Sequence, residues 1–299
     1  MSHRSDYQLN QICKYNKDGS QNTKETRHRN LVRFIKHMQD NRGYSSHWEL
    51  SKIGKKEVHR YVHDLKEKGL ADRTIENNLK DIRWLASKLN RERLIPSNRE
   101  CGLKKRAFSN ENKAVVLNAS HLAMMDKRLQ LINRLKFEFG LREKEALKFS
   151  YQEAIRKGDK IHLKGTWCKN GRPRSVPIVN DRQVQLLNEV RVFQEERGLN
   201  RYGKYSMIPN DKKFSSYRNE VQESSRLVGI KGHGLRHHWA HQRFEQLSGL
   251  VCPIAGGTPY EDLSIEEKEK WDVAAGGVNQ ELGHGEGRLD TTATYIGTR

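Results

Sequence analysis

The sequence predicts a mainly α-helical protein with a small β-sheet, divided into two domains. Its 299 residues are consistent with about two domains. Apolar residues recur at spacings of three and four over most of the chain, which is the period of a helix buried along one side. Two short segments, 160–164 and 174–178, flank an Asn-Gly dipeptide and have the pattern of a β-hairpin.

Residues 1–23 are polar and include a turn signal at 17–20, so we expect a flexible N-terminal arm. The segment 24–92 contains three helical patterns and is expected to form an α-helical domain. The second pattern ends at a glycine, Gly69, as helices commonly do. The apolar residues of the three helices are Leu31, Phe34, Ile35 and Met38; Val58, Tyr61, Val62 and Leu65; and Ile75, Leu79, Ile82, Leu85 and Leu89. The polar face of the third helix carries Arg73, Asn77, Lys80 and Arg83.

Residues 93–113 interrupt the helical pattern with Pro96 and Gly102 and contain the run Lys104-Lys105-Arg106. We expect a basic interdomain linker here. It could lie along the phosphates of a nucleic acid or be a solvated connector, and the sequence leaves both readings open.

The segment 114–299 is expected to form a mixed α/β domain. Ser120 is placed to cap a helix that runs to Leu135, and another helix begins at Arg142. Residues 253–277 are rich in glycine and acidic residues, and we interpret them as an inserted loop with one short helix at most. Between the hairpin and this loop, further helices are expected near 181–197, 212–228 and 233–247.

The chain is strongly basic, with 56 Lys and Arg residues against 37 Asp and Glu residues and a net charge of +19. Such an excess favours a polyanionic partner, either nucleic acid or an anionic membrane surface. No apolar run is long enough to span a bilayer and the N-terminus lacks the apolar core of a signal peptide, so we expect a cytoplasmic protein without a membrane partner. No Cys-x-x-Cys pair occurs, so we expect reduced thiols at Cys13, Cys101, Cys168 and Cys252.

Four residues of the second domain suit the binding of a phosphodiester. Arg142 and Arg236 supply guanidinium groups, which pair with phosphate oxygens and stay charged. His233 lies three residues before Arg236, so the two side chains share one face of a helix. His284 follows a Leu-Gly pair and can donate another hydrogen bond.

A lysine and a tyrosine complete the set. Lys169 lies at the tip of the hairpin, where its ammonium could reach a leaving group, whereas its competitor Lys164 lies inside the first strand. Tyr295 supplies a phenol that could attack phosphorus if flanking cations favour the phenolate. Tyr260 is a rival nucleophile, but it lies in the predicted insertion with no adjoining motif.

The order of these motifs resembles that of the tyrosine recombinases, the family of phage-type integrases and Xer-type resolvases. In that family the first arginine follows Gly-Leu and precedes an acidic residue by three positions, as Arg142 precedes Glu145 here. The family's lysine lies in a hairpin before an Arg-x-Val-Pro segment, which is matched by Lys169 and residues 174–177. The family's His-x-Leu-Arg, Leu-Gly-His and Thr-Thr-x-x-Tyr motifs are matched by the segments that end at Arg236, His284 and Tyr295. The resemblance covers about residues 24–299.

The resemblance implies a core-binding domain at 24–92 and a tyrosine-recombinase catalytic domain at 114–299, which together clamp duplex DNA. It implies strand exchange through a 3′-phosphotyrosyl link in a homotetramer, without a cofactor, for the integration or excision of a mobile element. Accessory DNA-bending or directionality proteins are further implied partners. The catalytic residues would be Arg142, Lys169, His233, Arg236, His284 and Tyr295, supported by Glu145. DNA contacts are expected from Arg73, Asn77, Lys80, Arg83, Lys104, Lys105, Arg106, Arg172 and Arg174.

The chain departs from the family pattern near its end. The segment from Arg236 to His284 is longer than the family's usual connection, and the interval from His284 to Tyr295 is slightly longer. Almost no tail follows Tyr295, although many relatives use a tail to dock onto a neighbouring protomer. We expect the insertion at 253–277 to take over that role.

The same residues are compatible with three other interpretations. A type IB topoisomerase-like enzyme would use similar chemistry to relax supercoils, and a non-catalytic DNA-binding regulator could use a decayed recombinase scaffold. The spacing of His233, His237 and His241 also fits a metal site, but no acidic ligand accompanies it and Arg236 would repel a cation. We therefore expect no metal, and we expect the other histidines of this segment and Trp239 to pack locally.

Overall fold

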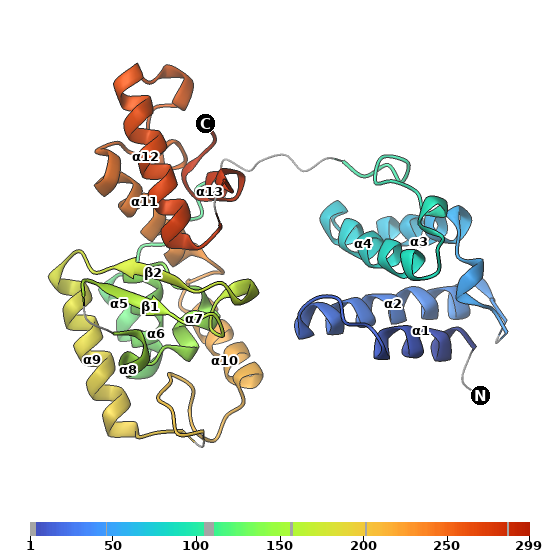
Figure 1. The fold of residues 1–299 in the computed structure, drawn as a ribbon, viewed down its shortest axis with the longest axis horizontal. Coiled ribbons are helices and arrows are strands. Elements are labelled where there is room, and N and C mark those ends of the chain that lie inside the picture. Colours follow the sequence, from blue (N-terminus) through green and yellow to red (C-terminus); the bar gives the residue numbers. More distant parts are fainter. Residues whose placement is uncertain (1–3, 46, 105–110, 156–157, 201, 286) are drawn as a thin grey trace. The chain divides into compact units, whose positions relative to one another are not determined.

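The computed structural model describes residues 4–45, 47–104, 111–155, 158–200, 202–285 and 287–299. The chain forms two compact units, Met1–Ala107 and Phe108–Arg299 (Figure 1). Each unit has its own buried core. In the described residues the first unit is helical, and the second combines helices with a two-stranded sheet. The predicted fold class, mainly α with a small sheet, is confirmed.

The first unit packs its helices around one apolar core. Its helices are α1 (Arg4–Lys14), α2 (Gln21–Arg42), α3 (Lys55–Glu67) and α4 (Asp72–Lys88), with short 3-10 turns at Leu50–Lys52 and Glu92–Leu94. Apart from the partly buried Leu89, the apolar residues that predicted the last three of these helices are buried, and Phe34, Ile35 and Leu79 have no exposed surface. Burial of these side chains is the main favourable contribution to the stability of the unit.

Residues 4–14 form a helix, so this part of the predicted flexible arm over 1–23 is ordered. α1 packs against α2, and Leu9 is only 1% exposed. The side-chain oxygen of Gln8 also accepts a hydrogen bond from the backbone nitrogen of Leu50 at 2.9 Å. A helix this short depends on tertiary packing rather than on its own propensity, which is why its local sequence did not predict it.

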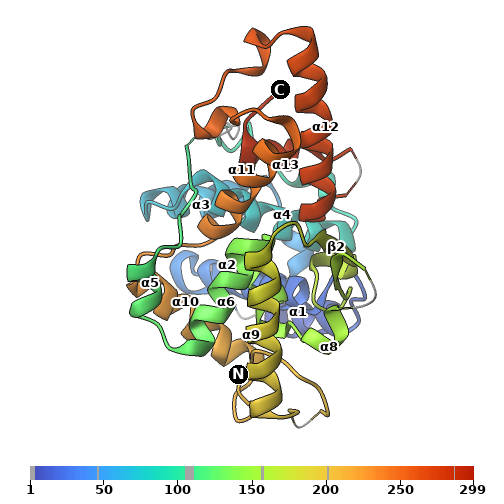
Figure 2. The ribbon, with the colours of Figure 1, turned by 90° about the vertical axis from the view of Figure 1, so that its left-hand side faces the viewer.

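The second unit contains the sheet and the remaining helices. Its strands are β1 (Lys160–Leu163) and β2 (Arg174–Pro177). Its helices are α5 (Ala119–Ala123), α6 (Lys127–Phe139), α7 (Glu143–Lys148), α8 (Tyr151–Ala154), α9 (Asp181–Arg197), α10 (Phe214–Leu227), α11 (Gly234–Ser248), α12 (Ile265–Leu282) and α13 (Leu289–Ile296). Helix α9 packs along α6, as the view in Figure 2 shows, and α11 packs against both α6 and α12. No helix described in the structure is long and apolar enough to cross a membrane.

The predicted β-hairpin is present, with β1 antiparallel to β2. Leu163 pairs with Arg174, so the connection 164–173 is longer than a tight turn. Asn170 and Gly171 have φ angles of +59° and +71° and bend this loop within a 3-10 turn at Lys169–Gly171. The loop places Lys169 and Arg172 at an exposed position beyond the ends of the strands.

Residues 253–277 are more ordered than the predicted inserted loop with one short helix. Two 3-10 turns, Pro253–Ala255 and Tyr260–Asp262, lead into the 18-residue helix α12. Ser264 caps this helix, and its side chain accepts a hydrogen bond from the backbone nitrogen of Glu267 at 3.3 Å. Gly276, Gly277 and the acidic residues made the apolar face of this helix hard to recognise in the sequence. That face is buried in the core of the unit and consists of Trp271, Ala274, Ala275, Val278 and Leu282.

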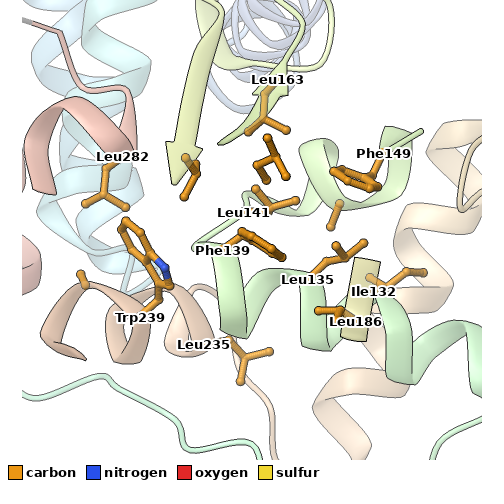
Figure 3. Close-up of a cluster of buried hydrophobic side chains, with 14 of the residues drawn as sticks. Ile132, Leu135, Phe139, Leu141, Phe149, Leu163, Leu186, Leu235, Trp239 and Leu282 are labelled. Atoms are coloured by element: carbon orange, nitrogen blue, oxygen red, sulfur yellow. The ribbon is translucent and has the colours of Figure 1, made fainter. Parts of the chain in front are cut away.

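One large apolar cluster holds the second unit together. Figure 3 shows Phe139, Leu141 and Trp239 in this cluster, together with Leu163 of β1 and Leu282 of α12. The segment between α6 and α7, the start of α11 and the end of α12 are therefore anchored in a single core. Most of the motifs singled out in the sequence lie on these three segments.

Candidate active site

The segment Gly140-Leu141-Arg142 joins α6 to α7 and positions the first arginine. Gly140 ends α6 with a φ of +58°, and a Cβ at this residue would lie 2.5 Å from the ring of Trp239. Only glycine accommodates both the left-handed backbone and this close approach. Leu141 is buried, and Arg142 then caps α7. The Gly-Leu-Arg pattern thus has a local structural cause.

Glu145 is a fully buried carboxylate that binds two arginines. Arg142 donates to it from its backbone nitrogen at 2.7 Å and from Nη1 at 2.9 Å, and Arg174 Nη2 donates at 2.7 Å. Burial alone would raise the pKa of Glu145, but the positive charges of Arg174 and the neighbouring arginines lower it to about 2. Glu145 is therefore ionised at neutral pH and orients both guanidinium groups.

Arg236, in the first turn of α11, has the largest of the fully buried side chains. Its Nη2 donates to the carbonyl oxygen of Leu282 at 2.7 Å, its Nη1 donates to the carbonyl oxygen of Gly140, and its Nε donates to the phenol oxygen of Tyr295 at 3.4 Å. Burial lowers the pKa of Arg236 to about 9, so the guanidinium remains charged at neutral pH.

The Leu-Gly-His motif ends α12 beside these arginines. Gly283 has a φ of +66°, and a Cβ there would lie 2.7 Å from Cδ of Arg174. The glycine lets the chain turn sharply, so that the Leu282 carbonyl faces Arg142 and Arg236, with Arg142 Nη2 donating to it at 2.9 Å.

Two neutral histidines accompany the arginines. His233 stands at the start of α11, where desolvation and the charge of Arg236 lower its pKa to about 4. His284 is half-buried after α12, and the same two causes lower its pKa to about 3. The Nδ1 atom of His284 lies 2.9 Å from the hydroxyl oxygen of Thr292. Both imidazoles are therefore uncharged at neutral pH.

Tyr295 lies on the short helix α13 among three histidines. The ring of His237 stacks on the phenol ring at a centroid distance of 4.4 Å, and the ring of His284 is tilted against it at 5.4 Å. Nε2 of His241 is 2.8 Å from the backbone carbonyl oxygen of Tyr295. With Arg236 Nε at 3.4 Å from the phenol oxygen, both the backbone and the ring of Tyr295 are held in place.

The two candidate lysines differ in their partners. Lys164 forms an ion pair with Glu153 at 2.5 Å. Lys169 is exposed on the hairpin loop, and its charge contributes to the lowered pKa of His284. Among the described residues no ion pair holds Lys169, which favours it over Lys164 for a role in the site.

Arg174 is buried and bonded within the protein, in place of the exposed position expected for a DNA contact. It is 7% exposed, and besides Glu145 it donates to the carbonyl oxygens of Gly140, at 3.3 Å, and of Glu281. Its inward direction follows from the alternation along β2, where it shares the buried face with Val176.

Arg83 is also committed to contacts within the protein. It is half-buried, and its Nη2 donates to the carbonyl oxygen of Pro96 and to Oδ1 of Asn98, both at 2.8 Å. These bonds tie α4 to the segment that follows it. The described contacts thus give Arg83 a structural role, and its DNA contact stays a prediction.

The other predicted DNA contacts have exposed side chains where the structure describes them. These are Arg73, Asn77, Lys80, Lys104 and Arg172, whereas Lys105 and Arg106 lie outside the described residues. Arg73 pairs with Glu76 at 2.6 Å. Nη1 of Arg172 lies close to Gly285, the residue after His284. A Cβ atom added to Gly285 would be 2.8 Å from this nitrogen. Arg172 is thus the member of this group that lies beside the candidate active site.

The sequence did not predict the residues that orient the candidate catalytic side chains. The Leu282 carbonyl, Thr292, Asn279 and the stacking of His237 on Tyr295 depend on tertiary contacts, and only the Thr-Thr-x-x-Tyr spacing hinted at Thr292. Trp239 packs in the core as predicted, and Tyr260 donates its hydroxyl to Asp272 at 3.2 Å.

The described residues contain no group of three or more His, Cys, Asp or Glu side chains that could hold a metal ion. The site instead gathers cations, neutral imidazoles and a phenol. Such a set is suited to binding a phosphate and stabilising the negative charge of a reaction at phosphorus.

Two family models match the chain in succession up to residue 242, and residues 243–299, with His284 and Tyr295, lie outside the matched ranges. The model described as phage integrase, N-terminal, matches residues 1–95, and the model described as integrase matches residues 98–242. No curated protein sequence matches this chain.

Solved structures of DNA-bound recombinases share the fold. A XerH site-specific recombinase bound to a palindromic difH substrate is 16% identical, with 97% of this chain and 80% of that chain covered and a TM-score of 0.57. The Tn1549 transposon integrase in complex with circular intermediate DNA is 15% identical, with 98% and 95% covered and a TM-score of 0.56. A lambda integrase dimer bound to a COC′ core site is 13% identical, with 96% and 76% covered and a TM-score of 0.58.

The fold and the matched models thus define an integrase-type protein. The chain belongs to the tyrosine recombinase family, among the phage-type integrases, as the order of its motifs predicted.

Proposed function

We propose that this protein is a site-specific DNA recombinase in which Tyr295 attacks a DNA phosphate and forms a 3′-phosphotyrosyl link. The observation that carries the proposal is the contact between Arg236 and the phenol oxygen of Tyr295, at 3.4 Å. It brings the nucleophile to a cation that is buried, charged and suited to binding phosphate.

The arginines retain donors for a substrate. A guanidinium group has five N–H donors, and the structure uses three of those of Arg236, for Gly140, Leu282 and Tyr295. The remaining N–H groups, with those of Arg142, would meet the charge that develops on the non-bridging oxygens in the transition state.

The remaining steps follow from the same residues. Lys169 would protonate the leaving 5′-oxygen, and a 5′-hydroxyl from a partner strand would then attack the phosphotyrosine and release Tyr295. The phosphotyrosyl bond conserves the energy of the phosphodiester, so the reaction needs no cofactor.

The wider setting is part of the same proposal. The first unit would bind duplex DNA through exposed side chains of α4 such as Arg73 and Lys80, consistent with the net charge of +19. Structural neighbours are described as DNA complexes of site-specific recombinases and a transposon integrase. We infer a cytoplasmic protein that acts as a homotetramer on DNA, aided by accessory DNA-bending or directionality proteins, in the integration or excision of a mobile element.

A nicked suicide duplex tests the chemistry, because loss of the cleaved fragment traps the covalent complex. A pool of nicked duplexes with a randomised core would be incubated with the protein and denatured in detergent, and the covalently bound DNA would be sequenced. We expect wild-type protein and Tyr260→Phe to be captured on a defined sequence and Tyr295→Phe not to be captured. Equal capture by Tyr295→Phe would overturn the nucleophile assignment, and relaxation of any plasmid without sequence preference would indicate a topoisomerase instead.

A further inference from the structure

A chain of hydrogen bonds runs from a backbone carbonyl to the imidazole of His284. Asn279 Nδ2 donates to the carbonyl oxygen of Gly285 at 2.8 Å, and the hydroxyl of Thr292 lies 2.8 Å from Asn279 Oδ1. The same hydroxyl oxygen lies 2.9 Å from Nδ1 of His284. Asn279 is 5% exposed and Thr292 is 1% exposed, so the middle of this chain is shielded from water.

The direction of every bond in this chain is determined by its first member. A carbonyl oxygen only accepts, so the Asn279 atom facing Gly285 is the amide nitrogen and the atom facing Thr292 is the amide oxygen. The single hydroxyl proton of Thr292 is then donated to Asn279. The Thr292 oxygen is left as an acceptor toward His284, and Nδ1 of His284 must carry the proton.

We propose that Thr292, oriented by Asn279, is a positioning residue that fixes His284 as the Nδ1–H tautomer and leaves Nε2 as a hydrogen-bond acceptor. Neutral His284 therefore enters the site as an acceptor, not as the hydrogen-bond donor to phosphate that its motif suggested. The cations around it, Arg236, Arg142, Arg174 and Lys169, disfavour a second proton on the ring.

The chemical consequence rests on the proposed function. The phenol of Tyr295 must lose its proton as it attacks, and the His284 ring lies against the phenol ring at a centroid distance of 5.4 Å. The proton moves from the phenol oxygen to Nε2 and the phenol oxygen forms a bond to phosphorus. The bond from phosphorus to the 5′-oxygen breaks, and that oxygen takes a proton from Lys169 and leaves as the 5′-hydroxyl. The resulting imidazolium then donates its new Nε2–H to the phosphate, whose negative charge stabilises it.

Nitrogen NMR of the full-length DNA-free protein tests the tautomer directly. In protein labelled with ¹⁵N-histidine, long-range ¹⁵N–¹H correlations report which ring nitrogen carries the proton, and the His284 signals are those missing from His284→Gln. We expect Nδ1–H in wild type and in Thr292→Ser, which keeps the hydroxyl. We expect Thr292→Val to shift His284 toward Nε2–H. An Nε2–H tautomer in wild type would overturn the proposal, even if Thr292→Val failed to fold.

Thr294→Val is the matched control. It removes a hydroxyl from the same helix, but among the described residues the partner of the Thr294 hydroxyl is the carbonyl oxygen of Thr291, to which it donates at 2.7 Å. We expect its His284 tautomer to match wild type, and a shift equal to that of Thr292→Val would contradict the proposal.

Covalent capture on the nicked duplex gives the functional readout. We expect Thr292→Val to form the complex on the order of ten- to a hundred-fold more slowly, with a changed pH profile, and Thr292→Ser to restore both. Wild-type rates in Thr292→Val despite a changed tautomer would overturn the role in catalysis. If wild-type protein forms no covalent complex at all, the proposed function fails, whereas the NMR result still decides the tautomer.

Discussion

Arg142 and Arg236 donate hydrogen bonds to the same backbone oxygen, the carbonyl of Leu282, at 2.9 and 2.7 Å. Two like charges thus converge on one acceptor at the end of α12. The carbonyl belongs to the negative end of that helix's dipole, and the ionised Glu145 lies beside Arg142. These two negative features stabilise the pair of guanidinium groups.

Arg236→Lys tests how much of the site depends on the planar guanidinium. A single ammonium does not reach Gly140, Leu282 and Tyr295 together, so two backbone carbonyls would lose donors. We expect covalent capture to slow by about 10²- to 10³-fold. Arg243→Lys is the control, because Arg243 lies on the same helix but pairs with Glu281 at 2.8 Å. Similar losses in both variants would contradict a specific role for Arg236.

Glu145→Gln should reduce stability in a pH-dependent way. The folded pKa of Glu145 is about 2, against an ordinary value of 4.5. The carboxylate therefore contributes stability that is complete above pH 4.5 and is lost as pH falls toward 2. The difference in pKa corresponds to about 3 kcal/mol at neutral pH.

Denaturant unfolding at pH 7 and at pH 3 measures this effect. The free energy of unfolding should fall less between the two pH values in Glu145→Gln than in wild type. Glu223→Gln, which removes a fully exposed carboxylate paired with Arg226, should keep the wild-type pH dependence. A wild-type dependence in Glu145→Gln would argue against the buried ion pair.

Gly140→Ala should destabilise the second unit. The new Cβ would meet the Trp239 ring at 2.5 Å in a left-handed backbone, at a combined cost of about 2–4 kcal/mol. Tryptophan fluorescence during denaturation would report both the stability and the changed surroundings of Trp239. Gly276→Ala is the counterpart, since Gly276 is helical with nothing near its Cβ position, and it should stabilise by about 0.5–1 kcal/mol. If the free energy of unfolding changed in the same direction in both variants, the packing argument would be contradicted.

Lys169→Ala should slow cleavage by about 10²- to 10⁴-fold if Lys169 protonates the leaving oxygen. A DNA substrate with sulfur in place of the bridging 5′-oxygen needs no such proton, because a thiolate is a good leaving group. Lys169→Ala should therefore cleave the sulfur substrate at nearly the wild-type rate. Lys164→Ala breaks only the ion pair with Glu153 and should leave both rates unchanged. If Lys164→Ala were the variant that cleaves slowly, and the sulfur substrate restored its rate, Lys164 and not Lys169 would be the residue that protonates the leaving oxygen.

Regular periodicity made much of the fold predictable. The helix expected near 181–197 is α9, Asp181–Arg197, and both strands of the hairpin lie where the pattern placed them. The six candidate catalytic residues all belong to the second unit, and five of them are linked through hydrogen bonds, ring contacts or mutual charge around Arg236. Lys169 joins them only through its charge at His284.

What escaped prediction depends on contacts between distant segments. Helix α1 is stabilised by its packing on α2, which its local sequence does not reveal. In α12, the acidic residues and two glycines interrupt the apolar periodicity that would have predicted a buried helix. Arg174 resembled a phosphate contact because its partner, Glu145, lies far away in the sequence. The period-2 alternation that it shares with Val176 was the available signal for its burial.

The position of the Leu282 carbonyl affects how the site would bind a substrate. Protein oxygens accept hydrogen bonds from both arginines, so the two guanidinium groups are oriented before any substrate binds. Under the proposed function, a phosphate would bind the N–H groups that the protein leaves unused. The selectivity of the site would then depend on how well an anion fits those donors in the orientation that the Leu282 carbonyl fixes.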